Sequence, residues 1–199
     1  MRILILSVPR SGSTTMFKSF RNELDEFNCY NEPWHISKDT DLIDINSHPN
    51  LLIKSLIYQQ PNLSERKDKE PMPYQYIDSF EFYEYLIPKF DKVILLDRMD
   101  KLSAGESYHN AISTNNWYDK WESTNGIVNP QMLGMFVSLS SRIKKISDRF
   151  DLKVWNYEDL FYEENESAIT SFVEEVGIDI KDIDSFLKYY DSKNKLRMV

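Results

Sequence analysis

Cysteine and long apolar runs are scarce in this chain of 199 residues. Its single cysteine, Cys29, cannot form an internal disulfide, which argues against the small disulfide-rich folds of secreted proteins. No segment approaches the roughly 20 consecutive apolar residues of a membrane-spanning helix, and the apolar start lacks the cleavage site of a signal peptide. We therefore expect a cytoplasmic protein without a membrane span.

Positive charge is also in short supply. The chain has 32 acidic against 24 basic side chains and a formal charge of −8, which repels a nucleic-acid backbone unless basic groups cluster locally. We expect no nucleic-acid partner, and nothing in the composition selects an oligomeric state. A hydrophobic content of 41% is enough for one sizeable core, so we expect a single domain over residues 1–199.

What the sequence does contain is a set of short apolar runs separated by helical patterns. Residues 3–8, 51–57 and 92–97 are unalternating runs, typical of parallel strands buried on both faces, and residues 152–157 form a weaker fourth. Helical spacing of apolar residues covers 13–24 and a long segment after Asn129 and Pro130. This alternation predicts a three-layer α/β fold whose central, mainly parallel sheet binds ligands at the carboxyl ends of its strands.

The stretch "SVPRSGSTT", residues 7–15, follows the first predicted strand and precedes a helix. Gly12 allows close approach of the backbone, the helix start offers free amides, and Arg10 adds a fixed positive charge. Hydroxyl donors occupy four of the next five positions: Ser11, Ser13, Thr14 and Thr15. A helix cap accounts for only one hydroxyl, so we predict a phosphate or sulfate site.

Two common phosphate loops do not fit this stretch. The mononucleotide loop GxxxxGK[ST] needs a second glycine and a lysine, and Gly12 is followed by neither. A tyrosine-phosphatase loop needs a cysteine shortly before an arginine, and Cys29 precedes no such arginine.

The segment "VPRSGSTTM" instead resembles the 5′-phosphosulfate loop, P-[RK]-S-G-[ST]-T, of sulfotransferases that use 3′-phosphoadenosine 5′-phosphosulfate (PAPS). The resemblance implies a P-loop-like fold and no metal. It also implies which residues hold the 5′-phosphate and the sulfuryl group: Arg10, Ser11, Gly12, Ser13, Thr14 and Thr15.

A second segment, "VILLDRMDKLSAGESYHNA", resembles the part of bacterial sulfotransferases that binds the 3′-phosphate. It implies that Arg98, at a strand end, and Ser107, on the following helix, contact this phosphate. Ser103 is the competing serine. Asp100 suits the cap position of that helix.

The third segment, "CYNEPWH", resembles the E-P-x-W-H segment of carbohydrate sulfotransferases, and it follows Arg10 at a spacing similar to that in tyrosylprotein sulfotransferases. The resemblance implies that Glu32 is the general base, because a carboxylate can take the proton of an acceptor hydroxyl. His35 is the rival base, and His48 and His109 are weaker candidates.

Two more site residues come from the same resemblance. Lys54 interrupts an apolar strand, where an ammonium must reach water or meet an anion; the family implies a role on the departing phosphate, and an edge-strand lysine is the alternative. Tyr157, in "YEDL", lies near the adenine in the family, and a buried core tyrosine is the alternative.

These segments together predict transfer of a sulfuryl group from PAPS to an acceptor hydroxyl or amine, which leaves 3′,5′-adenosine bisphosphate. A non-catalytic nucleotide-binding module and a P-loop phosphotransferase are the alternatives. We expect a small-molecule or carbohydrate acceptor, and four aromatic residues are candidates to line its site or to belong to the core: Trp34, Trp117, Tyr118 and Trp121.

Overall fold

The computed structural model of the chain describes residues 1–34, 43–58, 80–114, 130–161 and 166–186. Within them, five strands form one sheet in the order β2-β3-β1-β4-β5, and every pairing is parallel. The strands are β1 (Arg2–Ser7), β2 (Asn28–Asn31), β3 (Leu51–Leu56), β4 (Lys92–Asp97) and β5 (Val154–Asn156). The predicted three-layer α/β fold is confirmed.

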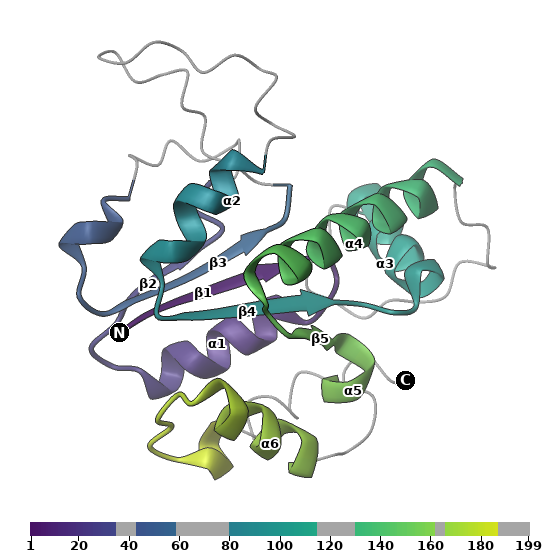
Figure 1. The fold of residues 1–199 in the computed structure, drawn as a ribbon. Coiled ribbons are helices and arrows are strands. Elements are labelled where there is room, and N and C mark those ends of the chain that lie inside the picture. The colour runs from purple at the N-terminus through teal and green to yellow at the C-terminus, as the bar shows by residue number, and fades with distance from the viewer. Residues whose placement is uncertain (35–42, 59–79, 115–129, 162–165, 187–199) are drawn as a thin grey trace.

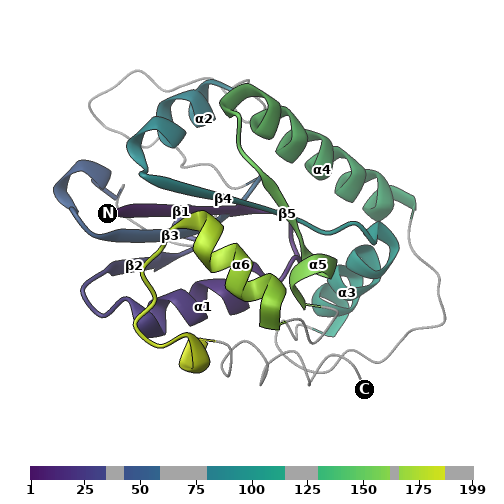
Figure 2. The ribbon, with the colours of Figure 1, turned by 60° about the horizontal axis from the view of Figure 1, so that its bottom comes forward.

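Helices cover both faces of this sheet (Figures 1 and 2). They are α1 (Ser13–Glu23), α2 (Glu81–Leu86), α3 (Lys101–Thr114), α4 (Pro130–Phe150), α5 (Tyr157–Phe161) and α6 (Glu166–Val176), with short 3-10 turns η1 (Ile45–Ser47) and η4 (Ile87–Lys89). Helices α1, α5 and α6 pack on one face, and α2 and α4 pack on the other. None of the described helices is long and apolar enough to cross a membrane.

The core consists of two apolar layers separated by the sheet. Successive residues of β1 alternate between them: Ile3 and Ile5 face α1, whereas Leu4 and Leu6 face α4, and all four are at most 1% exposed. A central strand that is buried on both sides favours apolar residues on both of its faces. This explains why the three strongest apolar runs predicted β1, β3 and β4 to within two residues.

The sequence-based reading of the strands was wrong at two places. Strand β2 was not predicted, because its sequence, NCYN, is polar and half-exposed at the edge of the sheet. The fourth run was predicted to extend to Tyr157, but β5 stops at Asn156 and Tyr157 begins α5. The charged stretch at 58–76 holds three prolines and no periodic pattern, so its sequence predicts a loop or lid. Most of this stretch, and Asn129, lie outside the described residues.

Candidate functional site

The loop after β1 presents a row of backbone N–H groups at the carboxyl edge of the sheet. Arg10 and Gly12 both have left-handed backbones, with φ of 62° and 76°. The amides of residues 11–15 donate to no acceptor among the described residues, and the first α1 bond runs from Met16 N to Gly12 O at 3.1 Å. Successive unengaged amides in a curved loop that leads into a helix form a concave anion site.

Buried hydroxyls hold this loop in shape. Ser11 Oγ donates to Val8 O at 2.8 Å, and Ser7 Oγ donates to Ser13 Oγ at 2.8 Å. Ser7 and Ser11 are fully buried and Ser13 nearly so. Two of the four predicted hydroxyls are thus engaged within the protein: Ser13 ties the start of α1 to the end of β1, and Ser11 bonds within the loop. Thr14 is half-buried and Thr15 is buried beside them.

Gly12 is required by its surroundings as well as by its backbone. A Cβ at this position would lie 2.4 Å from Cζ of the Phe161 ring, which comes from α5. The absence of a side chain therefore lets a ring of the same chain press against the loop, a reason that the sequence pattern did not reveal. The left-handed φ independently favours glycine.

Arg10 joins the first predicted segment to the second. Its Nε donates to Ser107 Oγ at 2.7 Å, and its carbonyl accepts from Arg98 Nη1 at 3.1 Å. Ser107 is 97 residues away in the chain. The structure therefore brings Arg10, Arg98 and Ser107 together at one end of the sheet.

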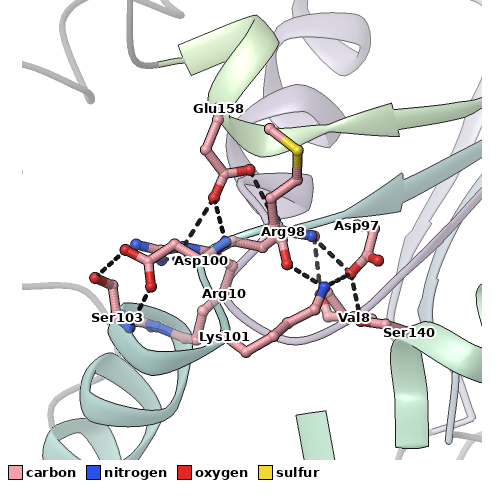
Figure 3. A network of polar contacts seen from close by, with 11 residues as sticks. Val8, Arg10, Asp97, Arg98, Asp100, Lys101, Ser103, Ser140 and Glu158 are labelled. Atoms are coloured by element: carbon pink, nitrogen blue, oxygen red, sulfur yellow. Dashed lines mark hydrogen bonds and ion pairs between the residues drawn. The ribbon is translucent and has the colours of Figure 1, made fainter. Parts of the chain in front are cut away.

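Arg98 is held by α5, which follows β5 (Figure 3). Its guanidinium lies 4.6 Å from the centroid of the Tyr157 ring, and its Nε lies 3.9 Å from Glu158 Oε1. The same carboxylate accepts from the amides of Met99 and Asp100 at 2.8 and 2.9 Å. Arg98 is 8% exposed, and its Nε has no hydrogen-bond partner among the described residues.

The start of α3 is fixed by Asp97, which the sequence reasoning missed (Figure 3). Asp97 Oδ1 accepts from Arg98 N at 2.7 Å, from Lys101 Nζ at 2.8 Å and from Ser140 Oγ at 2.7 Å. Asp97 ends β4 and Lys101 starts α3, so the spacing rule for pairs within one helix does not identify this network. Its last partner, on α4, has no counterpart in the local pattern.

The two candidate serines of α3 have different partners. Asp100 accepts from Ser103 N at 3.0 Å and from Ser103 Oγ at 2.5 Å, which confirms it as the helix cap. Burial raises the pKa of Asp100, but the hydrogen bonds from Ser103 and the charge of Arg98 outweigh it and the net pKa is lowered. Ser103 thus serves the cap, whereas Ser107 faces Arg10.

On the other side of β1, Glu32 and Lys54 form an ion pair. Lys54 is 1% exposed and lies on β3, an internal strand between β2 and β1, so the edge-strand alternative is wrong. Glu32 directly follows β2 and has a φ of 51°. Its amide still donates to Lys54 O at 2.7 Å, while its left-handed backbone ends the strand where its carboxylate meets the ammonium.

Two tyrosines extend this part of the site toward α3. Tyr58, just beyond β3, lies near Tyr108, the residue after Ser107. Burial and the neighbouring Tyr108 and Glu32 raise the pKa of Tyr58, so its hydroxyl stays protonated at neutral pH. No local sequence pattern indicates this pair.

Four other candidate residues lie outside the described residues: His35, Trp117, Tyr118 and Trp121. His48 Nε2 lies 3.5 Å from Tyr30 Oη, and His109 is exposed on α3.

Trp34 packs edge-on against Phe82 at 5.6 Å, with a half-exposed surface. Tyr157 is 6% exposed, and its ring stacks on Phe161 at 4.8 Å. Across the described ranges, no group of three or more His, Cys, Asp or Glu side chains is arranged to hold a metal ion.

No protein-family model matches the chain, and no curated protein sequence does. Among solved structures, the chain is similar to the crystal structure of mouse sulfotransferase SULT7A1 complexed with PAP, with a TM-score of 0.57 and 12% sequence identity. The match covers 96% of this chain and 63% of that one. The chain therefore has a sulfotransferase-like α/β fold, and it spans 63% of the length of this neighbour.

Proposed function

We propose that this protein is a sulfotransferase that uses PAPS. The observation that carries the proposal is the contact of Arg10 with Ser107 and Arg98, because it joins two segments with separate resemblances to nucleotide-binding segments of sulfotransferases. The Glu32–Lys54 pair lies toward the carboxyl edge of the same sheet, with Lys54 on β3, the neighbour of β1, and Glu32 at the end of β2. This edge is where ligands bind in parallel α/β folds.

The residues fit an anionic nucleotide. The amides of residues 11–15 offer donors for a 5′-phosphate, and Arg98 keeps a buried Nε without a hydrogen-bond partner in the described part of the chain. Ser107 and Arg98 form a site for the 3′-phosphate, and Arg10 on the 5′ loop donates to Ser107. Tyr157 is packed between Phe161 and the guanidinium of Arg98, so its ring supports Arg98. Its contact with the adenine remains a prediction.

When bound, PAPS supplies an activated sulfuryl group, and the protein needs to orient it, stabilise negative charge and remove one proton. The loop amides and Arg10 orient the donor, and the ammonium of Lys54 stabilises the oxygen that takes up the bonding electrons. Glu32 accepts the proton of the acceptor hydroxyl. The acceptor is a small molecule or a carbohydrate, and the half-exposed Trp34 offers it an apolar surface two residues from Glu32.

Calorimetry with 3′,5′-adenosine bisphosphate (PAP) tests the proposal against its two alternatives. We expect PAP to bind without metal and more tightly than ATP with magnesium. A preference for ATP with magnesium would indicate a phosphotransferase. Labelled PAPS offered with phenols, sugars and amines then tests transfer, since PAP binding without transfer to any of these acceptors would indicate a nucleotide-binding module.

A further inference from the structure

The Glu32–Lys54 pair poses a chemical problem for the proposed reaction, and the inference below rests on that proposed function. Lys54 is 1% exposed, and its ammonium is already bound to the carboxylate of Glu32. A buried ammonium cannot lose its anionic partner without a large cost in free energy, unless another anion replaces it. A carboxylate bound to an ammonium is in turn a weak proton acceptor.

The pairing depends on unusual backbone geometry. Asn31 lies opposite Lys54 in the parallel register of β2 and β3, so a regular strand would turn the next side chain, Glu32, to the other face. Its φ of 51° breaks this alternation. A left-handed backbone is unfavourable at a residue other than glycine, so the fold maintains this contact against local preference.

We propose that Lys54 is shared between Glu32 and the nucleotide, so that nucleotide binding releases the base. A 5′-phosphate oxygen on the loop replaces the carboxylate as the anion beside Lys54, and Glu32 becomes available to the acceptor. In the transfer step the acceptor oxygen forms a bond to sulfur, and the bond from sulfur to the bridging oxygen breaks. The electron pair of that bond stays on the phosphate oxygen beside Lys54, and the acceptor proton goes to Glu32.

The nearby tyrosines fit this arrangement. Tyr58 lies four residues after Lys54, and its backbone neighbour Ile57 donates to Ser7 O at 2.8 Å. Tyr58 lies near both Tyr108, on α3, and Glu32. Glu32 therefore has a tyrosine hydroxyl near it, and Lys54 contacts its carboxylate directly.

A double-mutant cycle with PAP as the probe tests the sharing. If Glu32 and PAP compete for Lys54, Glu32→Gln should tighten PAP binding by about threefold or more in the wild-type background. The same substitution should change PAP affinity less than twofold in the Lys54→Met background, where there is no ammonium to compete for. Calorimetry gives the affinities, and thermal unfolding checks that all four proteins are folded.

The two backgrounds separate sharing from simple charge repulsion. Equal tightening by Glu32→Gln with and without Lys54 would mean that the carboxylate merely repels the anionic nucleotide, and the inference would be overturned. Unchanged affinity in the wild-type background would overturn it as well. Failure of the folded wild-type protein to bind PAP would instead remove the proposed function, and the inference with it.

Discussion

The two sides of the loop that follows β1 are built differently. On the β4 side, Arg10 and Arg98 are held by contacts from several elements. On the β3 side, the buried Lys54 is paired with Glu32, which follows the edge strand β2. Arg98 contacts Arg10, Tyr157 and Glu158, and the start of α3 below it is fastened to α4 through Asp97. Because its contacts are distributed, the β4 side is suited to binding. The β3 side concentrates its chemistry in Glu32 and Lys54.

This difference predicts that the β3 side mainly sets the rate and that the β4 side supplies most of the nucleotide affinity. The strongest test is Glu32→Gln, which keeps the shape of the side chain but removes its basicity. We expect turnover of PAPS to fall by about 10² to 10⁴, measured as transfer of labelled sulfuryl groups in steady state. His48→Asn is the matched control and should keep wild-type turnover. An active Glu32→Gln together with an inactive His35→Asn would assign the base to the histidine.

The shape of the loop can be broken without removing any functional group. Gly12→Ala should lower the free energy of unfolding by about 2 to 4 kcal/mol, because a left-handed alanine is strained and its Cβ collides with the ring of Phe161. Denaturant unfolding measures this. Gly134→Ala is the control: it lies in α4 with nothing within 4 Å of an added Cβ, and it should stabilise by about 0.5 to 1 kcal/mol.

A smaller loss is expected when one arginine of the β4 side is removed. Arg10→Ala or Arg98→Ala should weaken PAP binding by about 1.5 to 3 kcal/mol, the range for hydrogen bonds to charged groups, with the fold retained. Calorimetry gives the affinities, and Arg149→Ala, which removes an exposed ion pair with Glu84, should leave them unchanged. Wild-type affinity in both variants would mean that the phosphates bind elsewhere.

On the β4 side, the two serines of α3 are expected to affect different properties: Ser107 the affinity for PAP, and Ser103 the free energy of unfolding. Ser107→Ala should weaken PAP binding by about 0.5 to 1.5 kcal/mol, since a neutral hydrogen-bonding group next to Arg10 is lost. Ser103→Ala removes a partner of the cap Asp100, so it should lower the unfolding free energy and leave PAP affinity near that of the wild type. The reverse pattern would assign the 3′-phosphate to Ser103.

The same comparison explains what could be predicted from the sequence. Buried central strands and the hydroxyl-rich loop are local patterns, so β1, β3, β4 and the residues around Arg10 were predictable. Strand β2 is too short and polar to carry a period. The Glu32–Lys54 contact, the ring of Phe161 over Gly12 and the separate partners of Ser103 and Ser107 depend on register and packing between distant segments, and no local pattern encodes them.

The smallest expected effect concerns the charge that starts α3, the helix that carries Ser107. In the folded protein the pKa of Asp100 lies below its ordinary value of 3.8, so folding favours its ionised form. The stabilisation is complete above pH 3.8 and is lost as the pH falls through the lowered pKa. Because Asp100 is largely exposed and asparagine is also a good cap, Asp100→Asn should cost less than about 1 kcal/mol at pH 7.

Denaturant unfolding at pH 7, 4 and 3 would measure this loss. We expect the difference between the wild type and Asp100→Asn to shrink at the lowest pH, where the wild-type carboxyl begins to take up a proton. Asp148→Asn, in an exposed pair with Lys144, controls for the loss of a surface charge away from the helix start. A difference that stays constant from pH 7 to 3 would show that Asp100 acts only through hydrogen-bond geometry. The position of Ser107 would then depend on neutral contacts and on Asp97.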